Sequence, residues 1–589
     1  MDPDTIASMS PKPERPPSIQ SLHSRKHEYG AINAAGTPKM TDDHDHDPPQ
    51  DDDQNNNHKL QRGLSARQVQ MIAVAGTIGT GLFLGTGRSL AQGGPASILI
   101  CYAFIGFIVY VTLLLLGEMA TQYPVAGSFN AYATRFFSPS YGFALSWNYW
   151  FNDAVSVAGD LTAAQILLQF WTDWPHTWVV SLVFWVFLVG TNAIHVKAYG
   201  ELEYWLASLK VATIVIFIIV GILVNVGVNN SHEYIGGKYW RIGDAPFVGG
   251  FGGFAKVFVT ASFAYGGTES LGITAGETKN PSKNMPRVVK FVFWRILIFY
   301  VVCILIVGLN VPYDYPNLSN KSTTTSPFTI VFKQIGSTAA SSFMNAVILS
   351  SVLSAGNHAL FAGTRVLYGL ATTTPRQAPK LFSWTSKQGV PLPALFLTSS
   401  ISALCFGSSF IGSGQLWGWL QNIVGVSNQI AWLSIGFASW RFRTAWIKQG
   451  RPLEELKFRA RWTWGWGHHF VIFAVTCLIL IQGWSSIFPT FSTVEFLSLY
   501  IEIPVMVVMT LIWLFIRRPN PNPRPTSGSS RSKRVLWFTD VVDANVVDLY
   551  RDEYEEELAP SDIIDNETRK RRLNEGKQRF FWRLYYWIV

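Results

Sequence analysis

Long neutral apolar runs alternate with short polar segments between about residue 69 and residue 516. Two of the longest runs, residues 89 to 117 and residues 390 to 440, contain no charged side chain. About 20 apolar residues are enough to cross the hydrocarbon core of a bilayer. Hydropathy therefore predicts twelve transmembrane helices, at about 69–92, 97–119, 142–170, 177–196, 204–228, 252–274, 290–311, 340–371, 393–411, 416–440, 468–488 and 495–516.

The composition supports this reading. Only 14% of the 589 residues are charged and 48% are hydrophobic, whereas soluble proteins average roughly 25% charged residues. So few charges cannot cover a large soluble surface, which excludes a soluble enzyme, a coiled coil and a disordered chain. The four cysteines lie in apolar runs without metal-ligand spacing, so neither a disulfide framework nor a metal site is expected. The predicted fold class is an all-α membrane protein.

Polar tails flank the apolar region. Residues 1 to 60 contain too little apolar periodicity to bury a core and are expected to form a disordered cytoplasmic tail. Within them, the acidic run at 42–47 is either a solvated stretch or a weak divalent-metal site. Residues 61 to 517 are predicted to form the transmembrane domain, and 518 to 589 a cytoplasmic C-terminal tail. Its basic, aromatic end, 569–589, either lies on a membrane surface or packs under the spans.

Lysine and arginine are distributed unequally between alternate loops. With the amino terminus inside, the outer loops hold only Arg88, Lys238, Arg241, Lys321 and Lys333. The inner loops hold Arg135, Lys197, Lys279, Lys283, Arg287, Lys290, Arg376, Lys380, Lys387, Arg441, Arg443, Lys448, Arg451, Lys457, Arg459 and Arg461. This asymmetry predicts a multi-pass protein with both termini in the cytoplasm. It also accounts for most of the net charge of +9 without a nucleic acid partner.

Two glycine-rich stretches interrupt predicted spans. The first span contains the sequence GTIGTG at 76–81, and the sixth contains FAYGGTE at 263–269. Interruptions at corresponding places in spans one to five and six to ten predict a 5+5 inverted repeat with broken first and sixth helices and two further helices. The amides freed at such a break attract an anion and the freed carbonyls attract a cation, which suits a zwitterion. The alternative is that the glycines only allow close helix packing.

Ionisable side chains within spans are costly and therefore mark candidate functional positions. These are Asp153, Asp160, Lys210, Lys256, Glu269, Arg295, His358 and Arg365. Asp153 and Asp160 are seven residues apart, so they share one helical face, which should line a cavity. His358 could titrate near neutral pH, although a hydrogen-bonded core histidine is the commoner case.

Eight stretches within residues 62 to 516 form a distinctive series. They are MIAVAGTIGTGLFLGTG (71–87), GGPAS (93–97), GEMATQYPVAGSFNAYA (117–133), VKAYGELEYWLASLKV (196–211), SFAYGGTESLGITAGETKNPSKNMPR (262–287), FWRILIFY (293–300), SPFTIVFKQIG (326–336) and NAVILSSVLSAGNHALFAGTRVLYGLA (345–371). In this order they resemble the fungal amino acid permeases of the amino acid–polyamine–organocation superfamily, and the basic amino acid permeases look closest.

The resemblance implies a substrate site at the two breaks. The substrate carboxylate would meet the backbone amides of Thr80 and Gly81, and the amino group would meet carbonyls around Ile78 and Phe263. Phe263 also matches an aromatic gate over the ligand. Within the tenth span, Val424, Ser427 and Asn428 are expected to shape the side-chain pocket.

Asp160 is our first candidate for contact with a cationic substrate side chain, because an unpaired carboxylate in a cavity gains most from a guanidinium or ammonium group. The alternative is a salt bridge to Arg295 or Lys256. Asp160 also departs from the family, in which importers of basic amino acids commonly carry Glu. A second departure is Asn357-His358, where Asn-Ser is usual.

The resemblance also implies coupling residues. Glu269 matches an acid implicated in substrate binding or coupling. Lys210 matches a lysine that replaces the sodium ion of sodium-driven relatives, so it is either a proton-linked group or a fixed structural cation. Sodium coupling stays open, since Ser350, Ser351 and Ser354 could supply ligand oxygens.

The sequence therefore predicts a proton-coupled secondary transporter, not an enzyme, that imports amino acids, chiefly lysine or arginine, across the plasma membrane by alternating access. The proton gradient is its driving force and no cofactor is expected. The alternatives are a broad-specificity permease, a non-transporting amino acid sensor on the same fold, and a cation–chloride cotransporter. Beyond substrate and lipid, ubiquitin-ligase machinery is a candidate partner at tail lysines such as Lys12, Lys26 and Lys39.

Overall fold

The computed structural model describes Met71 and residues 76 to 553, apart from 517–539 and gaps at 126, 173, 175, 195, 276–280, 320–324, 374–375, 387, 489 and 552. All regular structure in these residues is helical, which confirms the all-α prediction. The predicted N-terminal tail, with its acidic run and lysines, and the C-terminal stretch 569–589 lie outside the described residues.

The elements follow in this order: η3 (Gly81–Gly85), α3 (Thr86–Gln122), α4 (Ser128–Tyr132), η4 (Ala133–Phe137), α5 (Pro139–Leu168), α6 (Thr177–Ile194), α7 (Val196–Asn225), η5 (Lys238–Trp240), α8 (Gly250–Ala264), α9 (Ser270–Ala275), α10 (Pro281–Arg295), η6 (Ile296–Val302), α11 (Cys303–Asn310), α12 (Pro327–Lys333), α13 (Thr338–Thr372), η7 (Lys380–Ser383), α14 (Leu392–Ile401), η8 (Ser402–Gly407), α15 (Ser408–Ile411), α16 (Ser413–Lys448), η9 (Leu453–Glu455), η10 (Arg461–Thr463), α17 (Gly467–Ile481), α18 (Trp484–Ile487), α19 (Thr493–Tyr500) and α20 (Glu502–Ile516).

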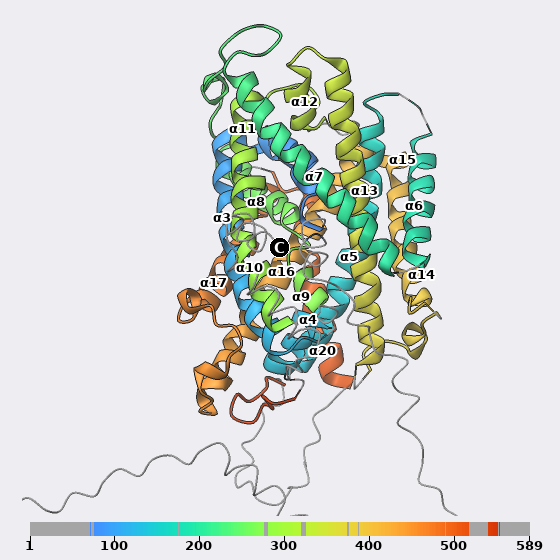
Figure 1. The fold of residues 1–589 in the computed structure, drawn as a ribbon, viewed down its shortest axis with the longest axis vertical. Coiled ribbons are helices and arrows are strands. Elements are labelled where there is room, and N and C mark those ends of the chain that lie inside the picture. The colour runs from blue at the N-terminus through green and yellow to red at the C-terminus, as the bar shows by residue number, and fades with distance from the viewer. Residues whose placement is uncertain are drawn as a thin grey trace, which may run out of the picture. The chain divides into compact units, whose positions relative to one another are not determined.

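Six of the described helical segments are long and apolar enough to cross a membrane, and α19 with α20, bent by 47°, makes a seventh if the pair is one span. The six are Gly81–Gln122, Gly200–Asn225, Pro281–Asn310, Thr338–Thr372, Leu392–Ile411 and Gly467–Ile487. Long helices run side by side along the bundle in Figure 1. A multi-pass membrane protein follows, while the number of twelve spans stays a prediction.

One of these segments is two helices in sequence. At 42 residues, Gly81–Gln122 would extend about 60 Å as a straight helix, roughly twice the thickness of a hydrocarbon core. Gly94 breaks it with φ 81° and ψ 172°, a conformation that favours glycine, and Pro95 follows. The two predicted spans, 69–92 and 97–119, lie on either side of this break.

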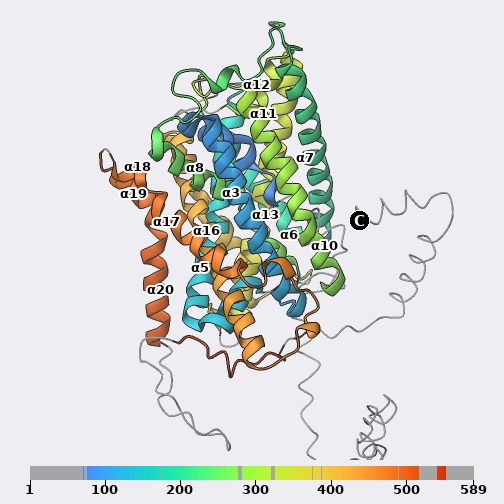
Figure 2. The same cartoon turned by 90° about the vertical axis from the view of Figure 1, so that its left-hand side faces the viewer.

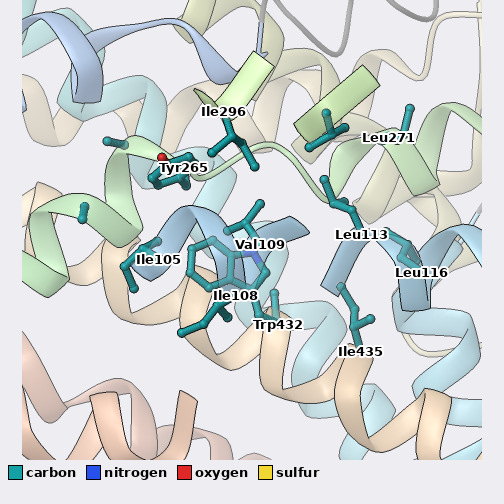
Figure 3. Close-up of a cluster of buried hydrophobic side chains, with 14 of the residues drawn as sticks. Ile105, Ile108, Val109, Leu113, Leu116, Tyr265, Leu271, Ile296, Trp432 and Ile435 are labelled. Atoms are coloured by element: carbon teal, nitrogen blue, oxygen red, sulfur yellow. The ribbon is translucent and has the colours of Figure 1, made fainter. Parts of the chain in front are cut away.

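The hydrophobic core lies where α3 meets α16 and the segment that joins α8 to α9. Figure 3 shows Ile105, Ile108 and Val109 of α3 packed beside Tyr265 and Trp432. Trp432 and Tyr265 are among the largest fully buried side chains. By contrast, many apolar side chains of α7, α17 and α20 are exposed, and α17 to α20 lie along one side of the bundle (Figure 2). These exposed faces are suited to lipid.

A buried ion pair fixes the segment between α16 and α17. Arg443 donates from Nε (2.9 Å) and Nη2 (2.7 Å) to Glu118 at the end of α3, and the Ala460 amide donates to the same carboxylate at 2.7 Å. Arg443 Nη1 donates to the carbonyls of Thr463 and Trp464. Glu118 is fully buried, so these hydrogen bonds take the place of water around its carboxylate.

Residues 540–553, which we call the strap, cross the end of the bundle opposite to α12 (Figure 1). Asp540 accepts hydrogen bonds from Ser138 Oγ and from the Ser140 amide, at the start of α5. Leu549 is fully buried, and its carbonyl accepts from Tyr123 Oη at 2.7 Å. The predicted C-terminal tail therefore contains an ordered segment held against the helices.

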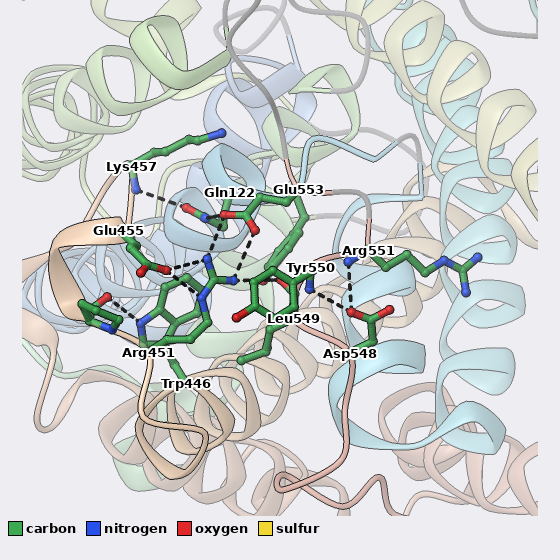
Figure 4. A network of polar contacts seen from close by, with 12 residues as sticks. Gln122, Trp446, Arg451, Glu455, Lys457, Asp548, Leu549, Tyr550, Arg551 and Glu553 are labelled. Carbon is green, nitrogen blue, oxygen red and sulfur yellow. Dashed lines mark hydrogen bonds and ion pairs between the residues drawn. The ribbon is translucent and has the colours of Figure 1, made fainter. Parts of the chain in front are cut away.

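Arg451 is the centre of the network that holds the far end of the strap (Figure 4). It contacts Glu553 and Glu455 and lies over the rings of Trp446 and Tyr550. Nearby, the amides of Tyr550 and Arg551 donate to Asp548 and hold the pKa of its carboxyl below the usual value. Asp548 therefore stays ionised near neutral pH, and this turn keeps its hydrogen bonds.

Replacing Glu118 by Ala should destabilise the protein by about 3–5 kcal/mol, because it leaves the Arg443 guanidinium buried without its counter-charge. The measurement is the thermal unfolding midpoint of the purified protein in lipid nanodiscs. Glu455→Gln is the matched control, since Glu455 is 45% exposed and such pairs contribute at most about 1 kcal/mol. Equal midpoints for the two variants would contradict the assignment.

Candidate functional site

The first break leaves helical geometry at Ile78 and Gly79, just before η3. It lies directly against the end of α8. A Cβ built on Gly81 would be 2.3 Å from the Cα of Ala264, closer than any side chain can approach. Position 81 therefore requires glycine, because any side chain there would collide with the backbone of α8. The alternative role of these glycines, close helix packing, would require the same.

The second break joins α8 to α9 through residues 265–269. Gly267 has φ +82°, which favours glycine, and a Cβ there would be 2.8 Å from the carbonyl oxygen of Gly76. The two glycine stretches, nearly 190 residues apart in the sequence, thus lie against each other. The two breaks are therefore neighbours in space, while the 5+5 inverted repeat stays a prediction.

Side chains from two other helical segments satisfy carbonyls freed at the breaks. Tyr300 Oη lies 2.6 Å from the carbonyl oxygen of Thr77 and 2.7 Å from that of Ala264, so one hydroxyl serves both breaks. Ser351 Oγ donates to the Ile78 carbonyl at 3.2 Å. Because lipid offers no hydrogen bonds, these donors stabilise the broken helices.

A small cavity lies between the breaks. This central cavity has a volume of about 60 Å³, room for about two waters at 30 Å³ each. Its lining includes Gly81, Asp153, Asp160, Phe263, His358, Val424 and Asn428. A molecule of amino acid size can enter only if the surrounding helices or Phe263 move.

Both third-span carboxylates face this cavity, as their spacing predicted. Asp160 is 4% exposed and accepts a hydrogen bond from Thr80 Oγ1, which ties α5 to the first break. Asp153 is 6% exposed, and its Oδ2 makes no hydrogen bond with the described residues. Each aspartate thus keeps an oxygen without a hydrogen bond to the described residues, and the Asp153 oxygen is the more deeply buried of the two.

Neither of the two alternative salt bridges for Asp160, to Lys256 or to Arg295, occurs among the described residues. Lys256 pairs with Glu495, Nζ to Oε2 at 3.1 Å. No ion pair between Arg295 and Asp160 occurs in the part of the chain that the structure describes. Asp160 instead interacts electrostatically with Lys210.

Lys210 belongs to a buried network that continues into α13. It lies within electrostatic range of Glu203 and Asp160. Glu203 is fully buried and accepts hydrogen bonds from Ser354 Oγ (2.6 Å) and Asn357 Nδ2 (2.7 Å). An ammonium group near two carboxylates can hold a proton or exchange it with them. Through these interactions Lys210 links Asp160 in the cavity wall to Glu203 and to α13.

Glu269 has four donors and does not line the central cavity. Tyr149 Oη donates to it at 2.8 Å, and Trp432 Nε1, Thr268 Oγ1 and the Gly267 amide donate at 3.2 Å. It is fully buried. This geometry anchors the second break to α5 and α16, since Tyr149 and Trp432 belong to those helices.

The remaining predicted residues divide between the cavity wall and its support. Phe263 and Val424 line the cavity, whereas Ser427 lies behind it and accepts from Asn148 Nδ2 at 2.8 Å. His358 lies in the wall, and its Nε2 is 3.0 Å from Ser270 Oγ. Of the candidate sodium ligands, Ser351 and Ser354 donate to Ile78 and Glu203, and Ser350 to its own helix.

Two further cavities lie along the same helical bundle. The first, the strap cavity, has a volume of about 580 Å³ and is lined by strap residues and by Ser146, Ile273 and Arg365. The second, the Arg88 cavity, has a volume of about 190 Å³ and is lined from α3, α8 and α16. The central cavity thus has a larger cavity on each side of it along the bundle.

Comparison with known proteins identifies the class of this site. Residues 68–522 match the amino acid permease family. The chain belongs to that family. It is 44% identical over 471 residues to a probable amino-acid permease of Schizosaccharomyces pombe, covering 77% of this chain and 92% of the relative.

Two more relatives extend this result. A lysine-specific permease of Escherichia coli is 43% identical over 428 residues, 72% of this chain and 86% of its own. A general amino-acid permease of Candida albicans is 39% identical over 463 residues, 77% of each chain. The protein is therefore a membrane transporter of the amino acid permease family and not an enzyme.

Sequence reasoning missed two residues that support this permease site. Glu203 falls one residue outside the predicted fifth span, yet it is seven residues before Lys210 and so shares its helical face. That spacing was the available signal. Tyr300 lies in an aromatic run, FWRILIFY, and nothing local distinguishes its hydroxyl from those of lipid-facing tyrosines.

Tyr300→Phe should lower the free energy of unfolding by about 1–3 kcal/mol, because it removes the one hydroxyl proton that two buried carbonyls share. The readout is again the thermal midpoint in nanodiscs. Tyr110→Phe is the control, since that hydroxyl makes no hydrogen bond with the described residues and its side chain is only partly buried. A shift no larger than the control's would show that Tyr300 does not stabilise the breaks.

Proposed function

We propose that this permease is a proton-coupled secondary transporter that imports cationic amino acids, chiefly lysine or arginine, across the plasma membrane. The observation that carries the proposal is the pair of buried carboxylates, Asp153 and Asp160, in the wall of the cavity between the two breaks. A cationic side chain is the ligand that offsets buried negative charge most effectively.

The ends of the substrate fit the broken helices. The amides of Thr80 and Gly81 start η3 and suit a carboxylate. The carbonyl of Ile78 accepts one hydrogen bond, from Ser351, whereas that of Phe263 already accepts from the amides of Tyr265 and Gly266. A carbonyl oxygen has two lone pairs, so the Ile78 oxygen can still accept from an ammonium group.

The substrate side chain would then lie toward α5. Asp153 offers an oxygen without a partner among the described residues, and Asp160 offers the oxygen that Thr80 does not occupy. The name of the lysine-specific relative agrees with a cationic substrate, whereas the general permease favours broad specificity. Broad specificity is the second candidate, and competition by neutral amino acids separates the two.

Alternating access accounts for three cavities arranged in succession. We infer twelve spans, in a 5+5 inverted repeat with two further helices, which place the Arg88 cavity outside and the strap cavity inside. Both termini are then cytoplasmic. The central cavity, at about 60 Å³, is too small to hold an amino acid, so transport requires opening first toward one larger cavity and then toward the other.

Coupling would use Lys210 and the carboxylates beside it. A proton taken up by this group changes the charge that Asp160 faces, and thereby the affinity for a cationic substrate. One positive charge that crosses 100 mV gains roughly 2.3 kcal/mol, so a cationic substrate also draws on the membrane potential. No cofactor is needed, and ubiquitin-ligase machinery at the tails is the regulatory partner we propose. A sensor of the same fold would bind substrate without flux.

Asp153→Asn and Asp160→Asn should each reduce lysine uptake at least tenfold, since each removes a charge that pairs with the substrate cation. The assay is uptake of radiolabelled lysine into cells that lack other basic amino acid permeases, normalised to surface protein. Phe151→Leu, at an exposed position of α5 outside the cavity lining, controls for perturbation of the same helix. Undiminished uptake by both aspartate variants would contradict a cationic side-chain site.

Lys210→Met should uncouple uptake from external pH, because the side chain keeps its length but loses its proton. The measurement is the initial uptake rate at two external pH values, with and without sodium, at constant membrane potential. Wild-type uptake should rise at the lower pH and ignore sodium. Uptake that follows sodium and ignores pH would overturn proton coupling.

A further inference from the structure

The Arg88 cavity contains the guanidinium of Arg88, and the described residues take up only part of its hydrogen-bonding capacity. Arg88 Nη1 donates to the Gly418 carbonyl (3.0 Å), to Gln421 Oε1 (2.8 Å) and, more weakly, to Asn422 Oδ1 (3.5 Å). Its Nε and Nη2 make no hydrogen bond with the described residues. No carboxylate among the described residues forms a salt bridge with Arg88. Sequence reasoning assigned Arg88 to an outer loop, whereas the structure places it inside α3, partly buried.

Other donors surround this guanidinium. Gln421 Nε2 and Trp417 Nε1 are buried and lack hydrogen-bond partners among the described residues, and Trp417 lines the cavity. Lys256 adds a second positive charge, although it is paired with Glu495 at 3.1 Å. The local excess of donors and positive charge calls for an anionic group.

The cavity is also in line with the central one. Arg88 is seven residues beyond Gly81, about 10 Å along the helix, and Thr260 is one turn before Phe263 on α8. On α16, Gly418 precedes Val424 by fewer than two turns. α8 and α16 therefore form walls of both cavities, and η3, which carries Gly81, leads directly into α3, which carries Arg88.

We propose that the Arg88 cavity is a second substrate subsite, in which the fork of Arg88 binds the α-carboxylate of an amino acid before it passes Phe263. A planar guanidinium with Nε and Nη2 available matches a carboxylate with two parallel hydrogen bonds. Glu495, 43% exposed at the cavity wall, accepts from the ligand's ammonium group. The volume of about 190 Å³ exceeds that of the central cavity threefold.

This subsite rests on the proposed function, because its ligand is the transported amino acid. Its chemistry differs from that of the central site. Here the protein supplies a fixed cation for the carboxylate, whereas the central site offers backbone amides to the carboxylate and acids to the side chain. The two sites can therefore be removed separately.

The test is equilibrium binding of radiolabelled lysine to the full-length protein in lipid nanodiscs. Wild type should bind two lysines per chain. Arg88→Gln and Asp160→Asn should each bind one, and Arg241→Gln, which removes an exposed arginine from the loop before α8, should still bind two. Arg88→Lys keeps the charge without the fork and should weaken the second site roughly tenfold.

Competition identifies the group that Arg88 holds. In the Asp160→Asn background, cadaverine, which is lysine without its carboxylate, should not displace bound lysine, and replacing chloride by gluconate should leave binding unchanged. Displacement by cadaverine, or by chloride at physiological concentration, would overturn the carboxylate subsite.

The stoichiometry also separates this proposal from the proposed function. A wild type that takes up lysine but binds one per chain, with no change in Arg88→Gln, would overturn the subsite alone. A wild type that neither binds nor takes up lysine would overturn the proposed function, and the subsite with it.

Discussion

The hydroxyl of Tyr300 satisfies the requirement on which the membrane fold depends. A helix that breaks within a membrane frees backbone carbonyls, and each must find a donor inside the protein. Tyr300 reaches one carbonyl from each break, at Thr77 and at Ala264. The close contact between Gly81 and Ala264 is possible because the carbonyls around it are satisfied. The central cavity, in turn, exists because the two breaks are held face to face.

Around this junction, the buried carboxylates differ in how completely they are bonded. Glu269 accepts from four donors and holds the second break to α5 and α16. Glu203 is bound by Ser354 and Asn357 and faces Lys210. Asp153, in the cavity wall, keeps an oxygen without a partner among the described residues. The fully bonded acids thus hold helices together, whereas the two aspartates of the cavity wall keep unused hydrogen-bonding capacity.

Much of this arrangement could be predicted from short-range patterns. Apolar runs located the helices, glycine clusters located both breaks, and a spacing of seven residues placed Asp153 and Asp160 on one face. Contacts between distant segments could not be predicted in this way. The pairing of Lys256 with Glu495 joins residues 239 positions apart, and the strap follows a polar segment that gives no local signal of an ordered end. The burial of Arg88 was missed because it was counted with the cations of the outer loops, although the predicted span 69–92 contains it.

The cavities on the two sides of the centre have different walls. Among the described residues, none lines both the Arg88 cavity and the strap cavity. The former is built from α3, α8 and α16, and the latter mainly from α4, α5, α13 and the strap. Sequence changes in the wall of one cavity therefore need not alter the wall of the other. The two ends of the proposed transport path can accordingly diverge independently of each other.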